Sequence, residues 1–161
     1  MSFTRVYNII TRYGPKDNAT VSDEFGNIVY TAKPRFSFIR NAFVIKDNNS
    51  KVVAKVMQKI SLIVPAYEIR LNDQPLVHIK RKLGFCVCYK IKGKPWEVVT
   101  DSNCEKYYVR DIENSTIYEI EKDLELLRHN YKLTVVSEDD PLLGTCIVIA
   151  IDLAMRAITK K

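Results

Sequence analysis

The sequence contains few of the residues from which common catalytic and phosphate-binding motifs are built. It has five glycines and two histidines, and it contains no G-x-S-x-G nucleophile elbow, Walker A loop, dinucleotide-binding glycine run or H-E-x-x-H zinc motif. The histidines, His78 and His129, lie in different segments, and we interpret each as an exposed strand or turn residue without a catalytic partner. No catalytic residue is assigned, and a non-enzymatic protein without a cofactor is expected.

The cysteines lack the spacing of a metal site. Cys86 and Cys88 are one residue apart, whereas structural zinc sites use paired C-x₂-C or Cys/His knuckles. The chain begins MSFTRVYNIITRYG, in which arginines interrupt the apolar residues and no cleavage motif follows. We therefore expect reduced thiols, no metal, and a cytoplasmic protein that is either free or peripheral to a membrane. The cysteines are Cys86, Cys88, Cys104 and Cys146.

The length and composition favour one domain spanning residues 1–161. The chain has 161 residues, of which 47% are hydrophobic, and carries a formal net charge of +6. This length allows one sizeable core. The positive charge favours contact with an anionic partner, such as lipid headgroups, nucleic acid or an acidic protein.

Most of the chain is built from similar segments of strand, turn and strand. ATVSDEFGNIVYTAKP and FVIKDNNSKVVAKVMQ align at a shift of 24 residues, and further copies follow. β-Branched residues flank turn formers such as Gly26-Asn27 and DNNS, and apolar and polar residues alternate along the arms. These patterns predict ten to twelve short antiparallel strands. Closing them into a barrel would remove exposed edges but leave an interior that side chains alone do not fill.

An apolar C-terminal segment, DDPLLGTCIVIAIDLAM, is the predicted occupant of that interior. Asp139 or Asp140 suits a helix N-cap and Pro141 the first helical position, so a helix over about 140–157 is expected. Its uncharged run, 142–151, covers only ~15 Å. A bilayer core is about 30 Å thick, so burial within the sheet is favoured over a membrane span.

Two charged residues interrupt the apolar helix. Asp152 and Arg156 are four positions apart, which allows them to pair on one helix face near the mouth of the barrel. Asp152 could alternatively be a site carboxylate. The pairing is favoured because no second catalytic group is recognisable beside Asp152 in the sequence.

Repeated V-x-D-x(5)-V hairpins followed by DPLLGTCIVIAID resemble the LURP-one-related family of the Tubby C-terminal-like superfamily, over essentially the whole chain. The small bacterial single-domain members are the most similar in length. The resemblance implies a roughly twelve-stranded closed barrel around a central apolar helix. It also implies phosphoinositide binding by basic barrel residues, as in Tubby proteins, or a scramblase-like role. No Tubby headgroup-binding position matches a position in this chain, and none is carried over.

One basic stretch, VHIKRKLGFCVCYKIKGKPW, supplies candidates for an anionic-ligand site. Two adjacent strands would place lysines on one outer face, where they could contact phosphate. Trp96 beside Lys94 could anchor the protein at a membrane interface. The same lysines could instead protect edge strands from aggregation. The candidates are Lys80, Arg81, Lys82, Lys90, Lys92, Lys94 and Trp96.

Three functions remain open from the sequence. The first is binding of an anionic phospholipid or membrane surface through the basic stretch. The second is a protein-interaction scaffold without lipid contact, and the third is an enzyme that uses Asp152. Nucleic acid is disfavoured because aromatic residues are not interleaved with the lysines on the outer side of the basic stretch, where they could stack on bases.

Overall fold

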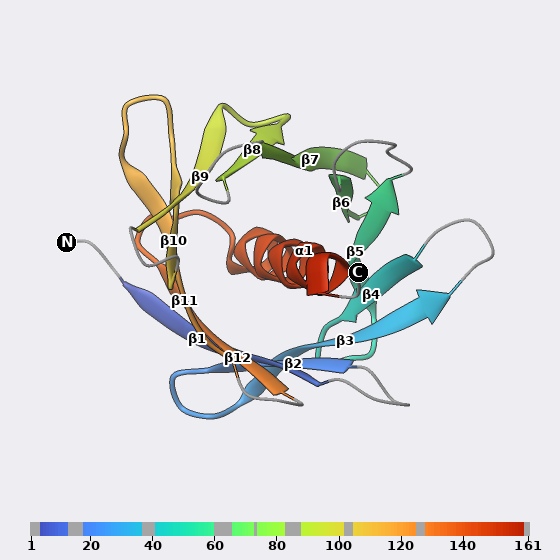
Figure 1. Cartoon of the computed structure of the whole chain (residues 1–161). Coiled ribbons are helices and arrows are strands. Elements are labelled where there is room, and N and C mark those ends of the chain that lie inside the picture. Colours follow the sequence, from blue (N-terminus) through green and yellow to red (C-terminus); the bar gives the residue numbers. More distant parts are fainter. Residues whose placement is uncertain are drawn as a thin grey trace.

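A computed structural model describes residues 4–12, 18–36, 41–59, 66–72, 74–82, 88–101, 105–124 and 128–159. Twelve β-strands precede one α-helix in these ranges (Figure 1). The strands are β1 (Arg5–Arg12), β2 (Asn18–Asp23), β3 (Ile28–Phe36), β4 (Asn41–Lys46), β5 (Val52–Lys59), β6 (Ala66–Leu71), β7 (Gln74–Lys82), β8 (Cys88–Lys92), β9 (Trp96–Thr100), β10 (Lys106–Arg110), β11 (Thr116–Leu124) and β12 (Arg128–Val135). The helix is α1 (Pro141–Thr159).

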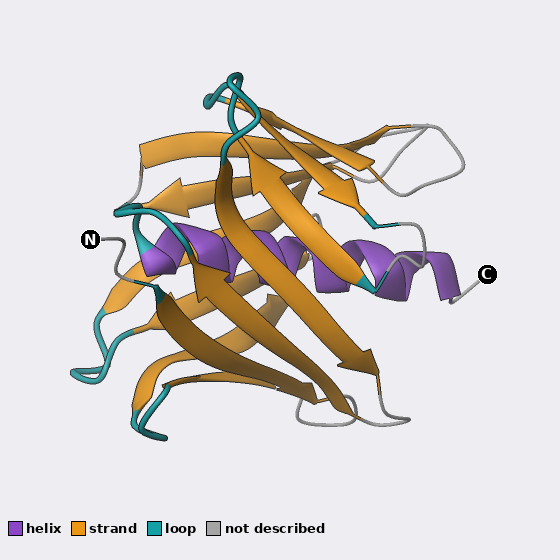
Figure 2. Ribbon diagram, turned by 90° about the vertical axis from the view of Figure 1, so that its left-hand side faces the viewer, coloured by secondary structure: helices purple, strands orange, loops and turns teal. Residues whose placement is uncertain are grey.

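The strands pair with their sequence neighbours in antiparallel register. In addition, β1 pairs with β12, so the order β1-β12-β11-β10-β9-β8-β7-β6-β5-β4-β3-β2 returns to its start as a closed barrel. The helix lies along the inside of the barrel and its C-terminal end projects from one opening (Figure 2). The prediction of a mainly β chain of short antiparallel strands with a C-terminal helix is confirmed for the described residues.

Alternation along each strand separates a core face from an outer face. On β5, Ala54 and Val56 are buried while Val53 and Lys55 are partly exposed. On β12, Leu133 is fully buried between exposed and partly exposed neighbours. This period of two follows from the pleat, which points successive side chains to opposite faces. The polar residues of the alternating pattern therefore form the outer surface of the barrel.

Three hairpin turns at the end where α1 begins share one geometry. An aspartate opens each turn, and one of its carboxylate oxygens accepts N–H bonds from the residues two and four positions later. For Asp23, Asp47 and Asp111 these bonds measure 2.9–3.0 Å. The residue three positions after the aspartate has a positive φ in every case: Gly26 (84°), Ser50 (60°) and Asn114 (65°). These side-chain bonds replace water at the turn backbone and hold each turn in one conformation.

The helix begins where the sequence predicts. The Leu142 N–H donates to Asp140 Oδ1 at 2.9 Å, so Asp140 is the N-cap and Pro141 takes the first helical position. The Tyr118 hydroxyl donates to the Asp140 carbonyl at 2.6 Å and fastens this end of the helix to β11. The helix extends to Thr159, two residues beyond the expected end.

Close packing explains the small residues of the helix. From Leu142 to Asp152 every residue is buried, which confirms that this segment lies within the sheet. A Cβ atom on Gly144 would lie 2.8 Å from Tyr118 Cε1, so only glycine fits between the helix and β11. In the ranges that the structure describes, no helix has the length and apolar character needed to cross a membrane.

Candidate anionic-ligand surface

The predicted basic strand pair is formed by β7 and β8. Lys80 pairs with Lys90 in the backbone register, Lys82 pairs with Cys88, and Lys92 pairs with His78. Lys80 is also paired with Ala66 on β6, so the basic strand pair lies directly beside β6 in the sheet. The side chains of Lys80, Arg81, Lys82, Lys90 and Lys92 lie outside the described part of the structure, and their role in binding stays a prediction.

Trp96 does not form the exposed anchor that the sequence suggested. Its side chain is only 9% exposed and packs edge to face against Tyr118, with ring centroids 6.1 Å apart. The Lys94 ammonium lies 4.8 Å from the centroid of the Trp96 ring. Trp96 therefore belongs to the core, and Lys94 covers it from outside. The alternation of Trp96 with buried Val98 is the sequence signal that indicates this placement.

Four neighbouring strands, β3 to β6, carry a basic surface that sequence reasoning missed. Their only acidic residue is Glu68, and all four strands are described. Because the cations are dispersed along the sequence, no local run of charge reveals them. Register brings them together: Lys33 pairs with Val44, Val44 with Lys55, and Lys55 with Arg70. We call this surface the basic face; its residues are Lys33, Arg35, Lys46, Lys55, Lys59 and Arg70.

A small pocket lies within the basic face. It has a volume of about 160 Å³, and Arg35, Lys55 and Arg70 line it together with valines of β4 and β5. Lys55 and Arg70 are directly opposite each other on β5 and β6. Like charges in this cross-strand position destabilise a sheet. Glu68, bound to Arg70, supplies one negative charge beside this pair, and the three cations that line the pocket still outnumber it.

A buried carboxylate orients one of these cations. Arg70 Nε donates to Glu68 Oε2 at 3.0 Å, and the Glu68 side chain is 9% exposed against 37% for Arg70. The bond uses one nitrogen of the guanidinium and restricts its rotation. A guanidinium fixed in this way loses less side-chain entropy when it binds an oxyanion.

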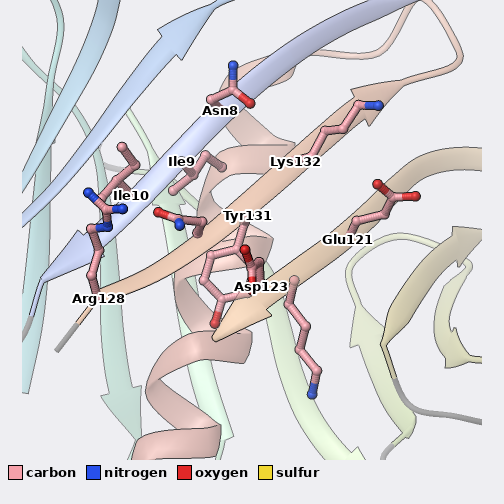
Figure 3. Close-up of a pocket in the computed structure, with 10 residues that line it drawn as sticks. Asn8, Ile9, Ile10, Glu121, Asp123, Arg128, Tyr131 and Lys132 are labelled. Atoms are coloured by element: carbon pink, nitrogen blue, oxygen red, sulfur yellow. The ribbon is translucent and has the colours of Figure 1, made fainter. Parts of the chain in front are cut away.

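The far side of the barrel has a different arrangement of charge. A pocket of about 410 Å³ lies over β12 and is lined by Arg128 and Lys132 together with Glu121 and Asp123 of β11 (Figure 3). Lys106 donates to Glu121 at 2.9 Å. This bond holds the pKa of Glu121 below its ordinary value, and the charge of Lys132 acts in the same direction. Acidic and basic side chains are balanced here, whereas on the basic face Glu68 is the one acid among the cations of β3 to β6.

The structure gives Asp152 partners that the sequence did not reveal. Asp152 is 2% exposed, and its Oδ1 atom accepts a 2.6 Å bond from the Tyr131 hydroxyl and lies 2.7 Å from His129 Nδ1. The prediction of an exposed, unpartnered His129 is wrong, because its side chain is 15% exposed and contacts Asp152. The Arg156 side chain lies outside the described residues, so the predicted pair with Asp152 stays a prediction. The contacts of Asp152 join the helix to β12.

Other polar groups surround the same end of the helix. Burial and the charge of Asp152 together raise the pKa of Tyr67 to about 12. Lys122 Nζ lies 3.4 Å from the Tyr107 hydroxyl, which donates towards Met155 Sδ at 3.6 Å. Asp152 lines neither of the two pockets described above, and no three metal-ligating side chains gather in the described ranges. The arrangement fastens α1 inside the barrel.

Comparison with known proteins places this architecture in a family. The chain is 24% identical over 141 residues to "Uncharacterized protein YxjI" of Bacillus subtilis, covering 87% of this chain and 86% of that protein. The X-ray structure of a protein from Arabidopsis thaliana is similar in fold, with a TM-score of 0.64 and 15% identity over 92% of this chain and 91% of that one. The sequence profile of the LURP-one-related family matches residues 11–152, and the chain therefore belongs to the LURP-one-related family.

Proposed function

We propose that this protein is a non-enzymatic barrel that binds the headgroups of an anionic membrane surface through the outer face of β3 to β8. The described basic face would supply Arg35, Lys55 and Arg70, and the β7–β8 strand pair would extend it. The observation that carries the proposal is the pocket in which these three cations converge beside a single acid, Glu68.

Arrangement of charge supports this function more than its amount does. Lys33, Arg35 and Lys46 are exposed, and Lys55 and Arg70 are partly exposed on the same side. Close to an anionic membrane each basic residue contributes about 1 kcal/mol. The volume of about 160 Å³ suits a single phosphate group better than a whole small molecule.

The test is co-sedimentation with vesicles of graded anionic lipid content at low and physiological salt. The variant Arg35→Gln, Lys55→Gln and Arg70→Gln should bind about two orders of magnitude more weakly, because three cations are lost. Binding by the unchanged protein should weaken as salt screens the attraction.

The side of the barrel formed by β1 and β10 to β12, where acidic and basic side chains lie together, provides a matched control. We call it the mixed side. Arg12, Arg128 and Lys132 are exposed on β1 and β12, and changing all three to Gln removes the same formal charge. This control should bind nearly as well as the unchanged protein. Equal loss in the two triple variants would mean that only net charge matters. Absence of vesicle binding by the unchanged protein would overturn the proposal and favour a protein-interaction scaffold.

A further inference from the structure

Three of the four exposed large apolar side chains of the described residues lie on two neighbouring hairpins. Among the described residues, the exposed large hydrophobic side chains are Phe25 (81%), Ile28 (51%), Val52 (41%) and Ile112 (84%). Phe25 and Ile28 belong to the β2–β3 turn region, and Val52 begins β5 directly after the β4–β5 turn. These hairpins are adjacent in the barrel, and both turns lie at the end where α1 begins.

Phe25 is held outward by its own turn. The Phe25 N–H donates to Asp23 Oδ1 at 2.9 Å, and the Asn27 N–H donates to the same oxygen at 2.9 Å. Because these bonds fix the backbone, little backbone entropy remains to be lost when the ring contacts another surface. The ring is therefore presented on a rigid support.

The apolar residues adjoin the basic face. Val52 pairs with Lys46 in the sheet, and it also lines the pocket that contains Lys55 and Arg70. Lys51, directly before Val52, is exposed. A surface that combines apolar tips with neighbouring cations matches the boundary between lipid headgroups and acyl chains.

We propose that Phe25, Ile28 and Val52 enter the headgroup region of a membrane and orient the barrel with the start of α1 towards the lipid. This inference rests on the proposed function and adds the docking end and the inserting residues. Exposed Glu24 beside Phe25 restricts the insertion to shallow depth, since a carboxylate is costly in hydrocarbon. The Asp23 carboxylate is occupied by the N–H groups of its own turn.

The chain offers a matched control tip. Ile112 is exposed to the same degree as Phe25, and Asp111 holds its turn by the same bonds at 2.9 Å. Both tips carry a neighbouring glutamate, Glu24 or Glu113. The β10–β11 hairpin, however, lies six strands away from β4–β5 in the closed order, across the barrel from Val52 (Figure 1).

The experiment compares Phe25→Trp with Ile112→Trp on anionic vesicles that contain lipids brominated near the top of the acyl chains. At equal bound fraction, the new tryptophan at position 25 should be quenched and blue-shifted, while that at position 112 should be unchanged. The native Trp96 is buried and is common to both proteins. Separately, Phe25→Ser should weaken vesicle binding about tenfold, and Ile112→Ser should leave it unchanged.

The outcomes separate this inference from the proposed function. Vesicle binding that depends on Arg35, Lys55 and Arg70 but gives no quenching at position 25 would overturn the proposed docking end. The proposed binding of anionic headgroups by the basic face would stand. Equal quenching at positions 25 and 112 would also overturn the docking end. If the unchanged protein does not bind anionic vesicles at all, both proposals fail.

Discussion

Two sides of one barrel carry the same kind of strand but very different arrangements of charge. On β3 to β6, cations pair across strands with uncharged residues or with another cation, as Lys55 does with Arg70. On β10 to β12, Glu121 pairs with Lys106 on one side and Lys132 on the other. The fold requires only that apolar and polar residues alternate along each strand, and this alternation is present on both sides. The difference supports our proposal that the basic face serves an external anion, whereas the charges of β10 to β12 compensate one another within the barrel.

The largest expected effect tests whether the β7–β8 strand pair belongs to the basic face. Changing Lys80, Lys82, Lys90 and Lys92 to Gln removes four charges and should weaken binding to anionic vesicles by about three orders of magnitude at low salt. Co-sedimentation measures this. Unaltered binding would confine the surface to β3–β6 and leave the strand-pair lysines as protection against aggregation.

A second prediction concerns a variant in which the mixed side is made more positively charged. Glu119 and Asp123 are exposed on β11, and the variant Glu119→Gln with Asp123→Asn leaves the cations of β10 and β12 less compensated. Vesicle binding should then increase by about tenfold at most, because the added attraction lacks a converging pocket. An increase that restores full binding to the Arg35, Lys55 and Arg70 triple variant would show that position is unimportant.

The two sides should also respond oppositely in stability. Replacing Lys33 by Met places an apolar side chain opposite Val44 and should raise the free energy of unfolding by about 0.5 kcal/mol. Replacing Lys106 by Met breaks the bond with Glu121 and should lower it slightly. Urea denaturation of both variants measures the difference. A loss of stability in Lys33→Met would contradict the interpretation that the cations of the basic face are kept for binding.

The smallest expected effect is a change in the pKa of Glu121 when its partner Lys106 is replaced. The Lys106 hydrogen bond lowers the pKa of Glu121 from its ordinary value of 4.5. A lowered pKa means that the stabilisation is fully present above 4.5 and is lost as pH falls through the folded-state pKa. NMR titration of Glu121 should show its pKa rising towards 4.5 in Lys106→Met. An unchanged midpoint would show that the pair does not form in solution.

Much of the fold could be predicted because its determinants are local. Alternation identified the strands, aspartate and turn formers identified the hairpins, and the length of the apolar run placed α1 inside. Residues far apart in the chain could not be paired in this way. Asp152 meets His129 only because the rotation of the helix faces it towards β12, and no spacing in the sequence encodes that rotation.

The candidate site was predictable only in part for the same reason. A run of lysines in β7 and β8 is visible in the sequence, whereas Arg35, Lys55 and Arg70 come from three different strands. Their convergence depends on the register that the hairpins set, including the irregularity between Ile45 and Lys46. Trp96 was misplaced because its neighbour Lys94 was given more weight than its alternation with Val98.

Lysine footprinting tests the central claim most directly on the unchanged protein. The protein is acetylated with and without anionic vesicles, and modification at each lysine is quantified by mass spectrometry. The account predicts that Lys33, Lys46 and Lys55 become protected when vesicles are present, while Lys106 and Lys132 react to the same extent. Equal protection on the two sides, or protection of Lys106 and Lys132 alone, would contradict it.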